Sequence, residues 1–317
     1  MRRFFGLAVA IVVLAPVAGM AGAAPPQTQG LIAFAERDRA NPDRVTIKTV
    51  RPDGTHVREI RLGEGHRWMP DGRRLLFATV YRRAHGLFTT TAAGRDLRWV
   101  DCYYCRRKPN PALDPLYFEW EPSPDGDRLV ALGSSGFVIR IVDITTGLDG
   151  DTVLDPDRDL VEDCGAGCES VFNPTWSPDG TRIAYIEGTA GYGGRICIVR
   201  AAGGNPRCIT SRGEDSRPDW SPDGRWIAFD RFCGRRCQTA IYVIRPNGTG
   251  LRRVRAHASD PSWSADGSRI AFVRLGRPGT CDTFPCGLGI GTMRRDGTDP
   301  RIVTRNARHF APEWQPR

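Results

Sequence analysis

One motif, Trp-Ser-Pro-Asp-Gly, recurs along the chain and restricts its fold more than any other feature. The motif stands at residues 176–180 and 220–224, and at 263–267 with alanine in place of proline. Looser copies occupy residues 68–72 and 120–126, the latter with two extra residues, and a truncated copy begins at Trp314. The six tryptophans are spaced 43 to 56 residues apart. Self-similarity at this period is typical of chains built from repeated four-stranded units.

The residues of the motif predict a tight turn between two strands. Proline fixes φ near −65°, which suits the second position of a type I turn, and glycine accepts the positive φ that follows. Short runs of β-forming residues come after the copies, for example at residues 182–186 and 269–273. No segment of the sequence keeps the i, i+3, i+4, i+7 apolar spacing of a helix. Each repeat is therefore predicted to be a meander of four antiparallel strands.

The two ends of the chain predict how the repeats assemble. Residues 31–34 match the second strand of a repeat, so the first repeat lacks its own first strand. Residues 311–314 match a first strand that has no repeat of its own. We therefore predict an all-β fold, a six-bladed β-propeller of four-stranded antiparallel blades. Its ring would be closed by the C-terminal strand pairing into blade one, which leaves only short protected edges.

The Trp-Ser-Pro-Asp-Gly copies, with the Ile-Ala-Phe and Ile-Tyr-Val strands that follow them, resemble the repeats of the TolB-type, WD-like β-propeller family. The resemblance extends from about Leu31 to Trp314 and is strongest in the last three repeats. It implies a secreted propeller that binds proteins or peptides across a central channel. TolB proteins carry a further N-terminal α/β domain, which we expect this chain to lack because few residues precede Leu31. A role in the Tol system therefore does not follow from the resemblance.

The first residues read as an export signal. Arginines at positions 2 and 3 precede an apolar run at residues 4–18, and small residues follow at 21–24. A basic segment, an apolar segment and an Ala-x-Ala site make a secretory signal peptide. The apolar run is shorter than the roughly 20 residues that span a bilayer. We predict a signal peptide at residues 1–23, then a six-bladed TolB-like propeller at 24–317 without a membrane span. The expected location is secreted or periplasmic.

The positive charge bears on the choice of partner. The chain has 45 basic and 36 acidic residues, and among the basic ones only Lys48 and Lys108 are lysine. A GC-rich genome produces such an arginine excess, and the arginines are interspersed with acids. The alternative is a field that attracts anionic envelope polymers, through pairs such as those at 106–107, 235–236 and 252–253. Because export separates the chain from most nucleic acid, we predict a protein, peptide or anionic envelope polymer as partner, no nucleic acid, and a monomer.

The ten cysteines fall into five pairs that are close in sequence. Zinc sites need two convergent Cys-x2-Cys pairs, and redox Cys-x-x-Cys motifs lie on βαβ units, so neither suits these repeats. An even number of cysteines in an exported chain favours disulfides. We predict Cys102–Cys105, Cys164–Cys168, Cys197–Cys208, Cys233–Cys237 and Cys281–Cys286. All but the third would lie in loops on one face, and preorganised loops suit binding.

The sequence lacks the motifs of a hydrolase. The segment Ser134-Ser135-Gly136 does not form the Gly-x-Ser-x-Gly elbow that carries a nucleophile. We predict an extracytoplasmic, non-catalytic binding or scaffold propeller for a protein, peptide or envelope glycan, without a cofactor. The alternative is a polysaccharide lyase or hydrolase with a metal-assisted site at the channel mouth.

Residues near the start of each innermost strand should stand near the channel. Those directly before each tryptophan should line it, and those two residues earlier should lie nearer the loops. The predicted binding residues are Arg67, Glu119, Asn173, Thr175, Arg217, Asp219, Asp260, Ser262 and Glu313. The alternative is that these polar side chains bind no partner and only solvate a water-filled channel. A metal is not favoured; its candidate ligands are His66, His257 and His309, each shortly before a repeat tryptophan.

Overall fold

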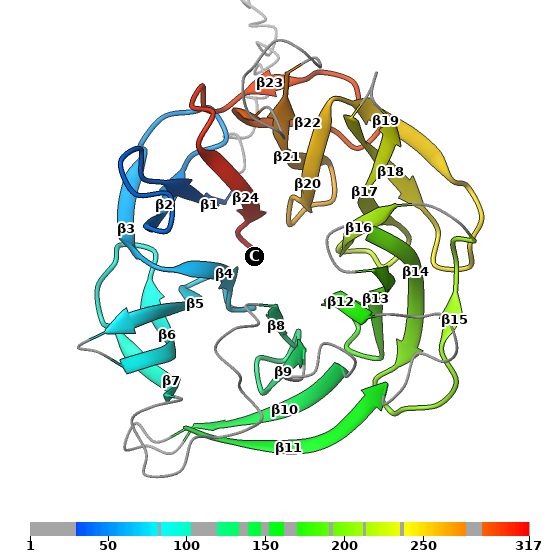
Figure 1. The fold of residues 1–317 in the computed structure, drawn as a ribbon, viewed down its shortest axis with the longest axis horizontal. Coiled ribbons are helices and arrows are strands. Elements are labelled where there is room, and N and C mark those ends of the chain that lie inside the picture. The colour runs from blue at the N-terminus through cyan, green and yellow to red at the C-terminus, as the bar shows by residue number, and fades with distance from the viewer. Residues whose placement is uncertain are drawn as a thin grey trace, which may run out of the picture.

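The computed structural model describes residues 30–81, 84–102, 119–132, 139–146, 152–161, 170–189, 193–211, 214–234, 238–276 and 287–316. The regular elements in these residues are β-strands, and their sheets are arranged around a central axis (Figure 1). The predicted all-β, antiparallel architecture is confirmed. Across the described ranges, no helix is long and apolar enough to cross a membrane. The predicted signal peptide lies outside the described residues.

Strands that are neighbours in sequence pair antiparallel within each sheet. The first sheet contains β24 (His309–Trp314), β1 (Ile32–Arg37), β2 (Val45–Val50) and β3 (Arg58–Leu62). The second contains β4 (Glu64–Trp68), β5 (Arg74–Tyr81), β6 (Ala84–Thr91) and β7 (Arg98–Cys102). The third contains β8 (Trp120–Pro122), β9 (Arg128–Leu132), β10 (Ile139–Thr146) and β11 (Thr152–Val161).

The remaining strands form an eight-stranded sheet and a final four-stranded one. The larger sheet contains β12 (Ser170–Trp176), β13 (Arg182–Thr189), β14 (Gly193–Arg200), β15 (Arg207–Cys208), β16 (Asp215–Trp220), β17 (Ile227–Gly234), β18 (Gln238–Ile244) and β19 (Arg252–Ala256). The final sheet contains β20 (Ala258–Trp263), β21 (Arg269–Leu275), β22 (Gly287–Arg294) and β23 (Arg301–Ile302).

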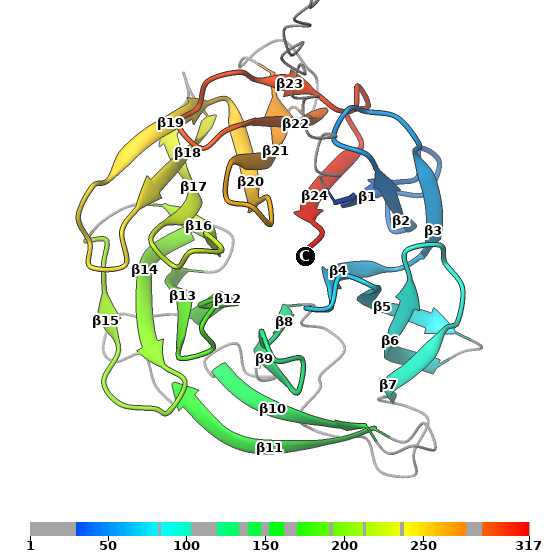
Figure 2. The ribbon, with the colours of Figure 1, turned by 180° about the vertical axis from the view of Figure 1, so that it is seen from behind.

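Two pairings connect parts of the chain that belong to different repeats. Strand β24 pairs with β1, which places Trp314 opposite Ile32. Both ribbon views show β24 between β1 and β20 (Figures 1 and 2). In the larger sheet, β14 and β16 meet through the pair Gly194–Asp215, which joins two four-stranded units. The larger sheet is therefore two repeats held side by side.

Each Ser-Pro-Asp-Gly copy folds as the turn that its residue types predict. In the copy at 176–180, the Gly180 N–H donates to the Ser177 carbonyl oxygen at 2.8 Å, and Gly180 has a φ of 66°. The Ser177 hydroxyl also donates to the Asp179 carboxylate at 2.5 Å. Equivalent serine–aspartate bonds recur at 221–223 and 264–266. The turn therefore fixes the register between the innermost strand and its neighbour.

The hydrophobic core lies between neighbouring sheets. Residues of the second strands, such as Phe34 in β1, are fully buried because both faces of these sheets are covered. Trp314 and Phe34 of the first sheet share one cluster with Val273 of the final sheet. Ile47 of the first sheet shares another cluster with Trp68 of the second. The first sheet is thus packed on both sides.

One predicted disulfide, Cys197–Cys208, is present and joins residues that are register partners in β14 and β15. Cys233 is also disulfide-bonded. Its predicted partner, Cys237, lies outside the described residues. The other predicted pairs lie wholly outside them, except for Cys102 at the end of β7. Among the described cysteines, none is free.

Candidate functional site

The centre of the molecule contains a cavity of about 430 Å³. Residues of the innermost strands β4, β8, β12, β16, β20 and β24, and of the turns that follow them, form its wall, and these strands face the axis in Figure 1. Motif tryptophans and prolines supply apolar surface, and charged and polar side chains of the same strands supply the rest. Because the repeats contribute equivalent positions, the wall is a product of the repeated sequence.

A relay of hydrogen bonds connects successive innermost strands at four junctions. The residue directly before the tryptophan position accepts a hydrogen bond from the tryptophan N–H of the following strand. The pairs are Trp68–Glu313 (2.8 Å), Trp176–Glu121 (3.0 Å), Trp263–Asp219 (2.7 Å) and Trp314–Ser262 (2.9 Å). In the first three, the indole Nε1 also donates to the backbone carbonyl oxygen of the same acceptor residue, at 3.2 Å. Each acceptor thereby orients its neighbour.

The third repeat departs from the alignment that the sequence suggested. That alignment placed Glu119, directly before Trp120, beside the channel. The turn that begins at Ser123 makes the same backbone hydrogen bonds as the other Ser-Pro-Asp-Gly turns, so the turn sets the register. Pro122 therefore occupies the tryptophan position, and Glu121 occupies the position before it. Glu121 lines the cavity and Glu119 does not. Aligning the turns rather than the tryptophans would have found Glu121.

Pro122 explains why the preceding repeat can carry an arginine in the relay. Proline has no N–H to donate, so the residue at the preceding relay position does not have to supply an acceptor. That residue is Arg67, and both residues line the cavity. The Arg67 guanidinium lies 3.4 Å from the Glu313 carboxylate instead. Arg67 therefore places a positive charge at the one relay position where an acceptor would find no N–H to bind.

A bulge in the innermost strands sets a second level of side chains. Three residues before the tryptophan, the backbone adopts positive φ, between 46° and 60°, at Gly65, Asn173, Arg217, Asp260 and Ala311. Strand register shifts around these positions. Bulges redirect side chains and are kept as designed features. The bulge is thus part of the repeat, and the residue type that fills it decides the charge at this level of the cavity.

Polar contacts link this second level across adjacent strands. Glu119 accepts a hydrogen bond from Asn173 Nδ2 at 2.9 Å, and Asn173 Oδ1 accepts one from the Arg217 N–H at 3.1 Å. The Arg217 guanidinium forms ion pairs with Asp260 at 2.6 Å and with Asp230, which is 3% exposed, at 3.5 Å. The Arg217 side chain is itself 56% exposed. This network therefore presents a fixed guanidinium at the cavity surface.

Burial shifts the pKa values of the relay carboxyls. It raises the pKa of Glu313 to about 7, and the Arg67 charge opposes the shift only in part. Burial likewise raises the pKa of Asp219 well above its ordinary value, and Glu121 and Glu313 add to the shift by repulsion. Burial alone would lower the pKa of Arg67, but Glu313 and Glu121 raise it. Arg67 thus stays charged among acids that resist ionisation.

Replacing Glu313 by glutamine should make stability less dependent on pH. Glutamine keeps an oxygen acceptor for the Trp68 N–H but carries no charge. Since the folded pKa of Glu313 is about 7 against an ordinary 4.5, the folded state holds its proton more tightly, and stability falls as pH rises between these values. The advantage of the variant over the wild type should grow from about 1 kcal/mol at pH 5 to about 3 kcal/mol at pH 8.

Urea unfolding at pH 5 and pH 8 measures this difference. Glu59→Gln is the matched control, because the Glu59 side chain is 68% exposed and should show no such change. A Glu313→Gln effect of the same size at both pH values would contradict the proposed cost of ionisation.

The structure brings most of the predicted binding residues together. Arg67, Asn173, Arg217, Asp219, Asp260, Ser262 and Glu313 line the cavity. Thr175 does not; it is buried, and its hydroxyl donates to Glu121 at 3.1 Å. Glu119 binds Asn173 at the second level. The function of these residues in binding stays a prediction.

The three candidate histidines do not come together. Burial lowers the pKa of both His66 and His309 to about 4, so both rings are neutral at pH 7. His309 Nδ1 lies 2.8 Å from Thr304 Oγ1, and its Nε2 lies 3.7 Å from Glu36. In the described part of the chain, the one group of three potential metal ligands within 4.8 Å of one another is Glu187, Cys197 and Cys208. Its two cysteines form the disulfide.

Four-stranded repeats around an axis, each lending its innermost strand to a central cavity, define a β-propeller. The chain belongs to the TolB beta propeller domain family, whose model matches residues 152–317. The TolB-type resemblance of the repeats is thereby confirmed.

Individual relatives match over shorter stretches or at lower identity. The Tol-Pal system protein TolB of Francisella tularensis is 33% identical over 84 residues, which are 26% of this chain and 19% of that protein. The chain thus matches about a fifth of that relative's length. The structure of TolB from Acinetobacter baumannii has a TM-score of 0.68 at 18% identity, covering 92% of this chain and 68% of that one. An oligogalacturonate lyase from Vibrio parahaemolyticus has a TM-score of 0.51 at 12% identity, covering 88% and 83%. At such identities the two structures show a shared fold alone.

Proposed function

We propose that this chain is an extracytoplasmic, non-catalytic propeller whose central cavity holds a peptide segment of a partner protein. The observation that carries the proposal is the cavity of about 430 Å³, with its tryptophan and proline wall and its few fixed charges. Ligand pockets typically combine an apolar wall with a small number of placed polar groups. The name of the relatives, Tol-Pal system protein, supports a role beside other proteins.

The use of the cavity carboxylates supports a non-catalytic role. A general acid or base must be within hydrogen-bond reach of a substrate proton. Glu121, Asp219 and Glu313 each accept a hydrogen bond from a tryptophan N–H instead. Their positions are therefore set by the packing of the repeats rather than by a substrate.

The proposal includes a closed ring of six four-stranded blades. Each half of the eight-stranded sheet counts as one blade, and the pairing of β24 with β1 is the closure. The cluster shared by the first and final sheets supports this arrangement. Closure would protect the strand edges that an open array leaves free.

The proposal also includes export as a monomer. Disulfides persist in oxidising compartments, and the Cys197–Cys208 bond supports a secreted or periplasmic location. We propose that cleavage follows residue 23 and that the other four local cysteine pairs are also disulfides.

The test of peptide binding begins with the full mature chain. Cross-linking to an extract of the source organism, followed by mass spectrometry, identifies attached peptide segments. A synthetic peptide with the sequence of the attached segment is then titrated against three proteins: the wild type, Ala265→Trp and Ala93→Trp. Ala265 lines the cavity where other repeats carry proline, so tryptophan there fills space without removing a bond. Ala93 is exposed in the turn after β6 and provides the matched control.

The expected result is equal binding to the wild type and Ala93→Trp, and binding at least about tenfold weaker to Ala265→Trp, a loss of about 1.4 kcal/mol. Unchanged affinity in Ala265→Trp would place the peptide outside the cavity and contradict the proposal.

A further inference from the structure

A groove outside the central cavity has an unusual excess of arginine. Its volume is about 620 Å³, and it shares no lining residue with the cavity. Five arginines line it, and we call it the arginine groove. They are Arg182, Arg207, Arg225, Arg245 and Arg295. Among the described residues of the wall, Asp223 is the one acidic residue. The groove therefore carries five positive charges against one negative charge.

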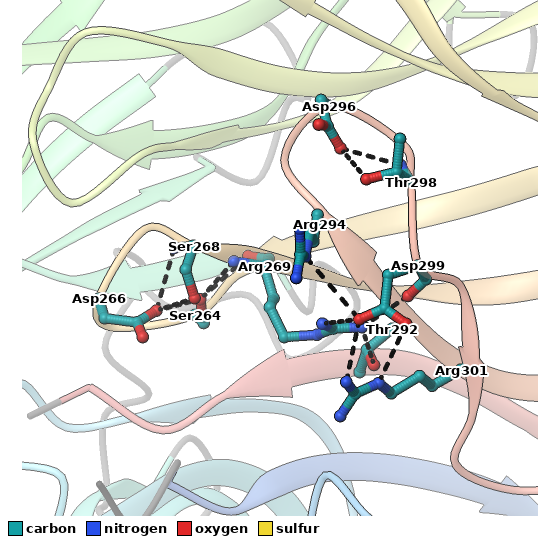
Figure 3. A network of polar contacts seen from close by, with 10 residues as sticks. All are labelled: Ser264, Asp266, Ser268, Arg269, Thr292, Arg294, Asp296, Thr298, Asp299 and Arg301. Atoms are coloured by element: carbon teal, nitrogen blue, oxygen red, sulfur yellow. Dashed lines mark hydrogen bonds and ion pairs between the residues drawn. The ribbon is translucent and has the colours of Figure 1, made fainter. Parts of the chain in front are cut away.

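Another sheet shows how the same repeat positions are neutralised elsewhere. In the final sheet, Asp299 follows the glycine turn between β22 and β23. It binds Arg269, at the start of β21, at 2.8 Å and Arg301, in β23, at 3.0 Å (Figure 3). The second sheet repeats the arrangement with Asp96–Arg74 (2.7 Å) and Asp96–Arg98 (2.8 Å). One turn aspartate thus serves at least two arginines, and Asp299 also lies 3.9 Å from Arg294.

The repeats that build the groove lack this aspartate. The pairing of β15 with β14 matches that of β23 with β22, so Arg207 corresponds to Arg301. Two residues before Arg207, at the place of Asp299, the chain has Asn205. In the following repeat, the same place is Gly250. The first of these repeats keeps both arginines, Arg182 and Arg207, without the shared counter-charge, and the second has Trp226 in place of Arg269.

Among the acids that the structure describes, none replaces it as a close ion-pair partner of two groove arginines. Among the described residues, one groove arginine forms an ion pair. Arg182 lies 3.9 Å from the Asp179 carboxylate. Asp223 accepts hydrogen bonds from the Ser221 hydroxyl at 2.6 Å and from the Arg225 N–H at 3.0 Å. Its oxygens are therefore partly occupied by its own turn.

Uncharged contacts hold the groove arginines in place. The Arg245 guanidinium lies 5.1 Å from the Trp226 ring centroid, and that of Arg182 lies 4.9 Å from the Trp220 ring centroid. Arg207 Nη2 donates to the Asn247 carbonyl oxygen at 3.2 Å. Aromatic and carbonyl partners attract a cation without cancelling its charge. The groove is thus ordered and still positive.

We propose that the arginine groove binds a linear polyanion whose repeating units carry carboxylate or phosphate groups. The planar guanidinium donates in pairs to either group. Five separate guanidinium groups need several anions to neutralise them, which a polymer supplies along its length and a single small ion does not. The groove is independent of peptide binding in the cavity, since the two share no residue.

The experiment measures binding of the full mature chain to defined probes at low and high salt. The probes are polygalacturonate for carboxylate and polyphosphate for phosphate, with dextran as the neutral polymer and a DNA duplex as the rival polyanion. The informative variant is Asn205→Asp, which restores the aspartate of the other sheets and removes no arginine. Arg207→Gln with Arg245→Gln removes two exposed guanidinium groups. Arg301→Gln is the matched control, at the same repeat position in the neutralised sheet.

We expect one or both acidic polymers, and not dextran, to bind in a salt-sensitive manner. A surface ion pair changes an equilibrium constant by up to about fivefold, so Asn205→Asp should weaken binding by about that factor and the double variant by about tenfold or more. Arg301→Gln should bind as the wild type does. The probe that binds identifies the anionic group.

Three results would overturn the proposal. The first is a lack of binding to both acidic polymers. The second is equal binding by the wild type, Asn205→Asp and the double variant. The third is tighter binding of the DNA duplex than of either polymer, which would assign the groove to nucleic acid.

Discussion

Deletion of residues 311–317 is expected to lower the free energy of unfolding by more than about 5 kcal/mol, a large part of the stability of a typical domain. The deleted segment contains Trp314, which is 4% exposed and belongs to the cluster between the first and final sheets. Loss of such a side chain alone costs about 3–5 kcal/mol. The deletion also removes Glu313, the acceptor for the Trp68 N–H, and most of the strand that pairs with β1.

The full-length variant Trp314→Ala separates the side chain from the strand and should lose only about 3–5 kcal/mol. Urea unfolding followed by circular dichroism measures all three proteins. A truncated chain as stable as the full chain to within about 1 kcal/mol would show that the β24–β1 pairing does not hold the repeats together.

Replacement of Arg231 by methionine is expected to cost about 3–5 kcal/mol at pH 7, because it leaves a buried charge without a partner. The Asp215 side chain is fully buried at the junction of β14 and β16. It accepts hydrogen bonds from Arg231 Nη2 at 3.0 Å and from Arg231 Nε. Burial raises the pKa of Asp215, and Arg231 opposes that rise. Methionine keeps much of the arginine stem but supplies no charge.

A second variant and a pH series test this cause. Without Arg231, the folded pKa of Asp215 should rise further above its ordinary 3.8, so the loss relative to wild type should shrink as pH falls toward that value. Adding Asp215→Asn should recover most of the lost stability at pH 7. A double variant as unstable as Arg231→Met alone would assign the loss to packing instead.

The strands and turns could be predicted from the sequence because their determinants are local. Proline, aspartate and glycine specify the turn within four residues, and the β-forming runs follow at once. Glu121 was missed because two extra residues separate Trp120 from its turn, and the alignment followed the tryptophans whereas the register follows the turn. The positive-φ bulge was also missed, since Asn173, Arg217 and Ala311 have no side-chain chemistry in common.

The two charged sites differ in how far the sequence could reveal them. The cavity residues follow from the repeat, because equivalent positions face one axis. The arginine groove depends on which acids lie beside the arginines in space. Arg207 and Arg301 look alike in the sequence, and only the partner two residues earlier, Asn205 or Asp299, separates an open guanidinium from a neutralised one.

The relay at the centre means that the blades of this protein are not interchangeable modules. Four blades carry the acceptor for the next one, so such a blade moved to a new place in the order would face a donor that it was not matched to. The Arg67 blade suits a following blade that has proline at the tryptophan position. Placed before a blade with tryptophan there, it would offer the tryptophan N–H no acceptor. A lengthened or shuffled propeller of this type must therefore copy adjoining blades as pairs, and inherited changes at the two matched positions should occur together.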